Sequence, residues 1–386
     1  MSKDVFIVSA VRTPIGKFNG GLSHLASFDL GALVLEEAVK RAGIEKDMVD
    51  EVIMGNILST EPRGNPAREA LLKARFPIQV KGYTVNKNCG SALKAINLAS
   101  IMLKMGEGKI LIAGGMENMS RVPFGLFGAR TGLGLGHVQL RDLLSDGLEG
   151  MGLTAERLAE KYSIKREEQD EFALRSQHLA ARAIREDRFR EQVVQVYCHC
   201  KKGLKVITED EGVKPDTTFE GLSRLKPVFK EGGTVTAGNS STINDGAAAV
   251  LLMTEDKVKE LGITPLARIV SWAEAGVEPE IMGIGPVPAT RLALQKAGLT
   301  LGDIDIVELN EAFAAQALAV IRELELDPDK VNVNGGAIAL GHPVGATGCI
   351  LIVKLIYELH RQGLKKGLAT LCIGGGQGIA TIIEAL

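Results

Sequence analysis

The sequence lacks the features that place a protein in or across a membrane. Lys, Glu or Gly interrupts every hydrophobic segment, so no run approaches the roughly 20 uninterrupted apolar residues that a membrane-spanning helix needs. The apolar run near the amino end has the length of a strand rather than of a signal segment, and Asp4 and Arg12 flank it. We therefore expect a soluble protein that is not exported.

A charge excess of either sign is also missing. The chain has 45 Lys and Arg residues against 47 Asp and Glu residues, a formal net charge of −2. This balance gives no strong field toward nucleic acid or an anionic membrane surface, so neither is an expected partner. A small-molecule ligand is the simpler expectation.

Two nucleotide-binding patterns and a disulfide framework are absent as well. No convincing G-x-G-x-x-G run links a strand to a helix, and no G-x-x-x-x-G-K-[ST] loop occurs, so phosphate sites of these kinds are not expected. The five cysteines are an odd number in a long chain, which argues for free thiols in a reducing compartment. We expect a cytoplasmic protein whose thiols are available for chemistry.

What the sequence does have is the pattern of a layered α/β protein. Short β-branched runs at 5–8 and 110–113 alternate with amphipathic helical stretches such as 30–41. The length of 386 residues exceeds that of a usual single domain, so two or more core units are expected.

A weak internal repeat indicates that the fold is duplicated. Three features recur in the same order, at offsets of 262, 254 and 260 residues: the run 7–9 at 269–271, Asn56 as Asn310 after similar apolar runs, and the glycine pair 114–115 as 374–375. Chance agreement of common apolar runs is the alternative.

The repeat divides the chain into two halves and an insertion. Residues 1–118 and 244–263 form one half and residues 264–386 the other. Residues 119–243 read as an inserted loop domain that covers the substrate, because this interval is charged and helical over 154–190 and then turn-rich to Gly233.

Cys89 is the first candidate for chemistry. It stands in the run 88–95 (NCGSALKA), between a turn-forming stretch and a helical pattern. At a helix start the free N–H groups and the helix dipole would lower the pKa of the thiol and raise the fraction of nucleophilic thiolate. The alternative is a small buried hydrophobic residue.

His342 is the only ionisable residue in the glycine-rich run 334–348, which is too apolar for a linker. Its offset of 253 from Cys89 places both residues at equivalent helix starts, where they could form a nucleophile and base pair. The alternative is a hydrogen-bonded structural histidine.

Three further motifs contain potential catalytic or ligand groups. Cys372 ends an apolar strand before three glycines, whose N–H groups could bind an oxyanion, and its thiol could serve as base or acid at carbon. Asn310 follows the strand 304–309 and could hold a water or cap a helix. The run 198–200 (CHC) lacks the second ligand pair of a zinc site, so we expect no metal.

Together these motifs resemble the thiolase family. The resemblance runs over the whole chain and rests on five motifs in the family's order: the stretch around Cys89, the run 236–241 (TAGNSS), the run 310–313 (NEAF), the His342 loop and the run 372–376 (CIGGG). It implies a duplicated five-layer α/β/α/β/α fold with an inserted loop domain, assembled as a homodimer or homotetramer.

The resemblance also implies a role for each residue in a reversible Claisen condensation of coenzyme A (CoA) thioesters. Cys89 would carry the acyl group and His342 would take its proton. Cys372 would remove the α-proton of the acceptor. A water on Asn310 would help His342 stabilise the enolate, and the N–H groups of Cys89 and Gly374 would hold the acyl oxygen. CoA thioesters are substrates here, and no further cofactor is expected.

The inserted domain would hold CoA. Residues that match the family's pantetheine contacts, its pocket walls and a basic position for the adenine nucleotide are Ser241, Ala237, Phe229, Met282, Lys214, Leu148, Met151 and Phe313.

One departure from the family pattern leaves the acyl chain length open. Members that form acetoacetyl-CoA usually carry a histidine just before the methionine of the run 148–152, where this chain has Gly150 in a shorter loop. The run 151–156 also resembles degradative 3-ketoacyl-CoA thiolases of fatty-acid oxidation. A ketosynthase is disfavoured by Cys372, and a non-catalytic acyl or lipid carrier by the intact Cys89, His342 and Cys372.

Overall fold

The computed structural model describes residues 4–58, 64–129, 132, 139–148, 150–200 and 203–386. Ten strands form one mixed sheet in the order β12-β13-β14-β11-β1-β10-β5-β3-β4, with β2 added to β10. The strands of this sheet are β1 (Val5–Arg12), β2 (Gly16–Lys17), β3 (Glu51–Gly55), β4 (Lys81–Val85), β5 (Ile110–Asn118), β10 (Asn244–Thr254), β11 (Ala267–Gly276), β12 (Ile306–Leu309), β13 (Lys366–Ile373) and β14 (Gln377–Ala385).

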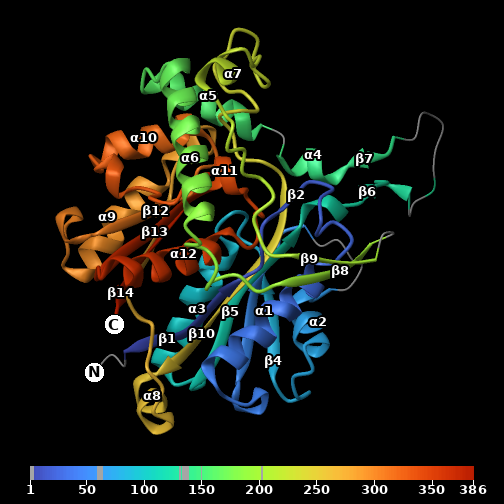
Figure 1. Ribbon diagram of the computed structural model, residues 1–386, viewed down its shortest axis with the longest axis vertical. Coiled ribbons are helices and arrows are strands. Elements are labelled where there is room, and N and C mark those ends of the chain that lie inside the picture. Colours follow the sequence, from blue (N-terminus) through green and yellow to red (C-terminus); the bar gives the residue numbers. More distant parts are fainter. Residues whose placement is uncertain (1–3, 59–63, 130–131, 133–138, 149, 201–202) are drawn as a thin grey trace.

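Helices cover the outer faces of the two halves of the sheet, and further helices lie between the two halves (Figure 1). The helices packed on the two halves are α1 (Ser27–Ala42), α2 (Pro66–Lys73), α3 (Ser91–Met105), α8 (Glu255–Leu261), α9 (Pro286–Ala297), α10 (Ala314–Leu324), α11 (Ala337–Leu340) and α12 (Thr347–Gln362). The predicted helix at 30–41 is confirmed as α1, and the predicted strand at 304–309 is shorter, as β12.

The described residues form five layers, as predicted, and three large hydrophobic cores hold these layers together. The central core contains α3, α12 and the inner faces of both halves of the sheet. One outer core lies under α1 and α2, and the other lies under α9 and α10. The two halves of the sheet are joined where Phe6 and Ile7 of β1 pair with Arg268 and Ala267 of β11.

Strand pairing confirms that the fold is duplicated. In each half an antiparallel trio is followed by a parallel strand: β1-β10-β5 with β3, and β11-β14-β13 with β12. The bulge between Ile7 and Ser9 recurs between Ile269 and Ser271, so the first repeat seen in the sequence is structural. Asn56 and Asn310 likewise follow equivalent strands, β3 and β12.

The third repeat seen in the sequence is wrong. Ile110 and Lys366 begin the equivalent strands β5 and β13, an offset of 366 − 110 = 256, so Gly114 and Gly115 do not correspond to Gly374 and Gly375. The first pair lies inside β5, where an added Cβ on Gly115 would stand 2.0 Å from the carbonyl oxygen of Gly345. On Gly114 an added Cβ would stand 2.0 Å from the carbonyl oxygen of Ala248 in β10. Gly115 is thus needed for close packing of the His342 loop and Gly114 for packing against β10, and neither ends a strand.

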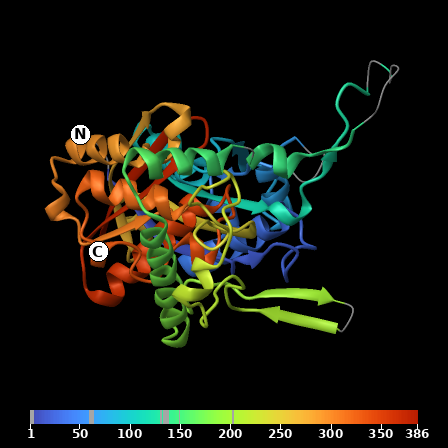
Figure 2. The ribbon, with the colours of Figure 1, turned by 90° about the horizontal axis from the view of Figure 1, so that it is seen from above.

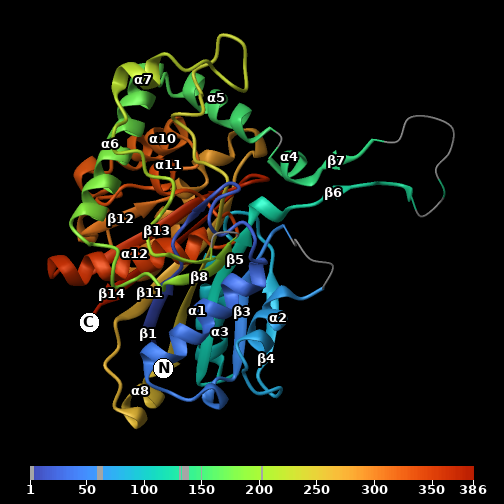
Figure 3. The same ribbon diagram turned by 45° about the vertical axis from the view of Figure 1, so that its right-hand side comes forward.

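The segment between β5 and β10 lies outside the main sheet and caps one end of it. Its elements are β6 (Phe124–Gly125), β7 (Arg141–Asp142), α4 (Leu143–Leu148), α5 (Met151–Lys161), α6 (Arg166–Arg185), β8 (Val196–Cys200), β9 (Gly203–Ile207) and α7 (Phe219–Ser223). The β6-β7 arm and the β8-β9 hairpin project from the body (Figures 2 and 3). A buried pair between Arg12 and Asp210, with nitrogen to oxygen distances of 2.7 and 2.9 Å, ties the segment to β1.

In the described part of the chain, no helix combines the length and apolar character needed to cross a membrane.

We predict that Gly115→Ala lowers the free energy of unfolding by about 1–3 kcal/mol, the usual effect of overpacking. The reason is that backbone atoms must move to admit the methyl group. Thermal unfolding measures this effect. Gly64→Ala is the matched control, since an added Cβ there meets no atom within 4 Å. Equal melting temperatures for the two variants would contradict the packing argument.

Candidate active site

Cys89 lies in a tight turn that leads into α3. Asn88 has a positive φ of 45°. The Ser91 hydroxyl closes the turn, since it accepts from the N–H of Lys87 at 2.8 Å and donates to the carbonyl of Asn88 at 2.6 Å. The thiol is therefore held in front of the helix, as predicted.

This turn meets the glycine turn of the other half. The Asn88 side chain donates to the carbonyl of Gly374 at 2.8 Å, and the backbone N–H of Gly374 is close enough to the thiol of Cys89 to act on its pKa. Gly374 thus lies where its N–H could also bind an oxygen attached to an acyl group on Cys89.

The pKa of Cys89 departs from the sequence-based expectation. Burial raises the pKa of the thiol above its ordinary value of 9.0, and the N–H groups of Gly374 and Cys89 offset this only in part. The prediction of a lowered pKa is therefore wrong, because loss of solvation outweighs the helix start. The resting group is a thiol that needs a base.

Cys372 lies at the end of β13 with no solvent exposure. Burial raises the pKa of its thiol, and negative charge on Cys89 raises it further, so the two sulfur atoms lie within electrostatic reach of each other. Two thiols that are 283 residues apart in sequence (372 − 89) therefore belong to one site.

The backbone around His342 is fixed from the first half of the fold. Its N–H donates to the Asn244 side chain of β10 at 2.9 Å. Gly341 has a φ of 112°, and an added Cβ there would stand 2.4 Å from the same side chain, so the close approach requires glycine.

The predicted equivalence of Cys89 and His342 is off by three residues. α3 and α12 begin at Ser91 and Thr347, an offset of 347 − 91 = 256, so the counterpart of Cys89 is Gly345. His342 nevertheless reaches the same region, since Cys89 and Ile243 pack against one small cluster that contains Val344. Ile243 also forms a bridge with His342.

The imidazole of His342 is buried and neutral over the physiological range. Burial lowers its pKa to about 4. Its Nδ1 lies 2.6 Å from the Thr347 hydroxyl, and its Nε2 lies 3.5 Å from the Asn310 side-chain nitrogen. A neutral imidazole with a free ring nitrogen can accept a thiol proton.

Asn310 is fully buried at the end of β12. It does not cap a helix, because α10 begins at Ala314 with Phe313 as its N-cap. Its side-chain oxygen has no hydrogen-bond partner among the described residues, so it can accept from a water or a ligand.

Glu117, at the end of β5, organises this region and was missed from the sequence. Its carboxylate accepts from the Asn56 side chain and from the N–H groups of Ile57, Leu58 and Gly345, at 3.0 to 3.1 Å. Burial raises its pKa to about 8, while the N–H groups act in the opposite direction. The signal in the sequence was a carboxylate directly after an apolar strand.

A cavity of about 600 Å³ opens beside His342. Seven of the eight residues proposed for CoA line it: Ser241, Ala237, Phe229, Lys214, Leu148, Met151 and Phe313. The eighth, Met282, lies in the outer core. Lys17 and Phe18 also line the cavity and were not predicted.

The wall of this cavity extends to the glycine turn at Gly374. An added Cβ on Gly374 would lie 3.3 Å from the sulfur of Met151, so Met151 borders both. Phe229 and Phe313 meet edge to face at 6.0 Å, and the 240–241 strand segment pairs with 312–313. The TAGNSS and NEAF motifs thus form one wall.

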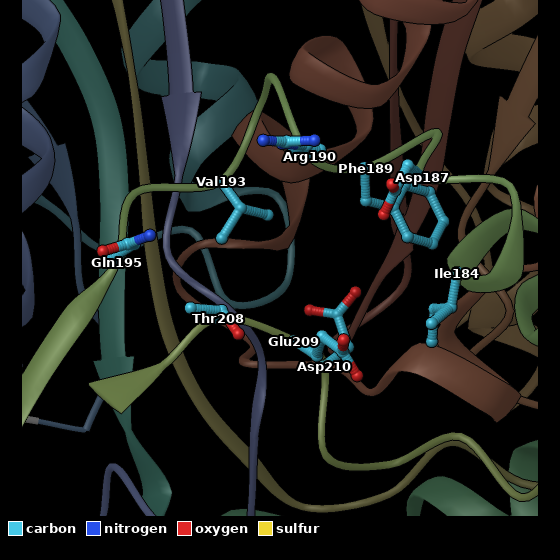
Figure 4. Close-up of a pocket in the computed structure, with 9 residues that line it drawn as sticks. All are labelled: Ile184, Asp187, Phe189, Arg190, Val193, Gln195, Thr208, Glu209 and Asp210. Atoms are coloured by element: carbon cyan, nitrogen blue, oxygen red, sulfur yellow. The ribbon is translucent and has the colours of Figure 1, made fainter. Parts of the chain in front are cut away.

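A second cavity, of about 240 Å³, lies on the inserted segment away from these groups. Figure 4 shows Arg190, Asp187, Glu209 and Asp210 around it. It contains none of the predicted catalytic residues. Of the run 198–200, Cys198 is buried, and the side chains of His199 and Cys200 lie outside what the structure describes. Within the described residues no group of three or more His, Cys, Asp or Glu side chains could hold a metal.

Two thiols, a neutral imidazole and an apolar cavity on a duplicated α/β fold define an acyltransferase. The family model for the thiolase N-terminal domain matches residues 5–256, and that for the thiolase C-terminal domain matches residues 263–385. The chain belongs to the thiolase family.

Similar proteins cover the whole chain. An acetyl-CoA acetyltransferase of Escherichia coli K12 is 53% identical over all of both chains, and one of Pseudomonas aeruginosa is 52% identical over 98% of each. A crystal structure of the Bacillus anthracis acetyl-CoA acetyltransferase matches with a TM-score of 0.98 at 48% identity, covering 100% of this chain and 99% of that one. Human mitochondrial 3-ketoacyl-CoA thiolase also matches, with a TM-score of 0.98 at 43% identity and the same coverage.

We predict that iodoacetamide alkylates Cys89 slowly at pH 7 and that the rate still rises above pH 9, because burial raises the pKa of the thiol. Mass spectrometry of the labelled peptide measures the rate, and Cys89→Ser corrects for labelling elsewhere. A rate that levels off below pH 8 would contradict the raised pKa.

Proposed function

We propose that the protein is an acetyl-CoA acetyltransferase that joins two acetyl-CoA molecules into acetoacetyl-CoA and CoA, and catalyses the reverse thiolysis. The observation that supports this most is that the Cys89 turn is bonded to the glycine turn at Gly374, with the thiols of Cys89 and Cys372 within electrostatic reach of each other. The names of the bacterial relatives agree with it.

Cys89 begins the reaction as nucleophile. Its sulfur attacks the thioester carbonyl while its proton passes to Nε2 of His342, and the same proton then leaves with the thiol of CoA. The negative oxygen of the intermediate is held by the N–H groups of Cys89 and Gly374. Each such donor increases the rate by a factor of about 10² to 10³.

Cys372 then acts at carbon. It removes the α-proton of the second acetyl-CoA, and the enolate oxygen is stabilised by His342 and by a water on the free oxygen of Asn310. The enolate carbon attacks the acyl carbon, and the bond between that carbon and the Cys89 sulfur breaks. The proton that Cys372 took from the substrate then passes to the Cys89 thiolate, so both thiols are restored. Acylation prevents Cys89 from carrying negative charge, which removes one cause of the raised pKa of Cys372.

The cavity fits the rest of CoA. Ser241, Ala237 and Phe229 would contact pantetheine, and Lys214 would meet a phosphate of the nucleotide, with Lys17 as a second cation at the cavity. A CoA complex of human mitochondrial 3-ketoacyl-CoA thiolase has the same fold, with a TM-score of 0.96. The side chains cover every proton and acyl transfer, so the proposal needs no cofactor.

A degradative 3-ketoacyl-CoA thiolase with longer substrates is the second candidate, supported by the equally close human structure and by Gly150. Values of kcat/KM for thiolysis of acetoacetyl-CoA and of longer 3-ketoacyl-CoAs decide between them. The first proposal expects the highest value for acetoacetyl-CoA. A maximum at longer chains would favour the second.

We also propose a cytoplasmic homodimer or homotetramer. The exposed side chains of Phe124, Phe127 and Leu140 on the β6-β7 arm support self-association, and sedimentation velocity measures it. Cys89, Cys349 and Cys372 have free thiols, which suits a reducing compartment.

We predict that Cys89→Ser abolishes the thioester acyl-enzyme formed from labelled acetyl-CoA, because no thiol remains to carry the acyl group. Cys372→Ala should still be acylated but should not exchange the acetyl α-protons with deuterium oxide. Mass spectrometry and proton NMR measure the two steps. Retained exchange in the second variant would refute the role of Cys372. A wild-type protein that acetyl-CoA never acylates would instead be a carrier.

A further inference from the structure

Thr347 bonds the ring nitrogen of His342 that faces away from Asn310. It is the first residue of α12 and is 2% exposed. Its hydroxyl oxygen lies 2.6 Å from Nδ1 of His342 and 3.0 Å from the carbonyl oxygen of Pro343. The carbonyl of Pro343 also accepts from the N–H groups of Ala346 and Thr347, at 2.8 and 3.0 Å. A carbonyl oxygen cannot donate, so its 3.0 Å contact with the hydroxyl oxygen is favourable only if the hydroxyl hydrogen lies between the two oxygen atoms.

The position of the single hydroxyl hydrogen of Thr347 then decides which ring nitrogen of His342 carries a hydrogen. The hydroxyl has one hydrogen, and if it donates that hydrogen to Pro343 it can only accept from His342. Nδ1 must then carry a hydrogen, and Nε2 is left with a lone pair. In the opposite arrangement, the hydroxyl donates to Nδ1 and the two oxygen atoms at 3.0 Å face each other with no hydrogen between them.

The orientation of Asn310 agrees independently. A lone pair on Nε2 suits the amide NH₂ group that faces it, and the 3.5 Å separation is too long for a firm hydrogen bond, so the lone pair stays available for a proton. The amide oxygen of Asn310 then points elsewhere, and it has no partner among the described residues. The opposite tautomer carries a hydrogen on Nε2, which would turn the amide oxygen of Asn310 toward His342. That oxygen would then no longer be free to accept from the proposed water.

We infer that Thr347 fixes His342 in the tautomer that carries its hydrogen on Nδ1, so that Nε2 is free to receive the proton of Cys89. Thr347 touches no substrate and is a positioning residue. The inference rests on the proposed role of His342 as the base, and it adds the group that selects the basic nitrogen. A base in the wrong tautomer presents a hydrogen where a lone pair is needed.

The test compares Thr347→Val, which keeps the shape and loses the hydroxyl, with Thr347→Ser, which keeps the hydroxyl. Nitrogen-15 NMR of protein labelled at its six histidines reports the tautomer, and His342→Gln identifies the resonances of His342. The rate of acylation of Cys89 by acetyl-CoA is measured by rapid quenching. Thermal unfolding of each variant shows whether it is folded.

In the wild-type protein we expect hydrogen on Nδ1 and none on Nε2. Thr347→Val should shift the ring toward the opposite tautomer and slow acylation about 10²-fold, the lower range of a general-base contribution. Thr347→Ser should keep the tautomer and most of the rate, although it lacks the methyl group.

Two results would overturn the inference: hydrogen on Nε2 in the wild-type ring, or a Thr347→Val protein with unchanged tautomer and rate. The first needs only the assignment of the His342 resonances, so a misfolded Thr347→Val protein does not prevent the test. The tautomer is read without substrate. A wild-type ring with hydrogen on Nδ1 but no acylation would therefore refute the proposed function and leave the tautomer assignment standing.

Discussion

The site depends on the packing of the His342 loop of one half against the strand ends of the other. The carbonyl of Gly345 fills the space where side chains on Gly55 and Gly115 would stand, and its N–H donates to Glu117. These contacts leave no room for a shift, because backbone meets backbone. The loop that carries His342 is thereby fixed to the half that carries Cys89.

The electrostatics of the site follow from the same close packing. Burial raises the pKa of the Cys89 and Cys372 thiols and lowers that of His342, so all three groups are neutral at rest. Charge arises only when a proton moves between them or from a substrate. N–H groups fixed in advance at the position of the new charge can then act without rearrangement, which is where preorganisation lowers a barrier most.

The sequence predicted the layers, the duplication and the residues that meet, since strand and helix periods and motif order are local or linear signals. It failed where the outcome depends on what surrounds a residue. The pKa of Cys89 was misjudged because the helix start was visible and the burial was not. The sequence pattern at Gly114 and Gly115 is that of a strand end, because a sequence does not show which backbone atoms pack against a glycine. Glu117 bonds a partner 228 residues away, outside the motifs that pointed to catalysis. Thr347 lies in the His342 run, but the run does not show that its hydroxyl bonds the imidazole.

Duplication explains why the substrate cavity adjoins the glycine turn. In the second half, β13 returns into β14 through residues 374–376, whereas in the first half the equivalent strands β5 and β10 are separated by the whole inserted segment. Insertion and turn therefore occupy corresponding places in the two halves. One supplies walls such as Met151 and Phe229 for a large ligand, and the other supplies a bare backbone N–H at Cys89. A symmetric pair of short turns could not enclose a ligand, and a pair of long insertions would bury the reacting atoms under side chains.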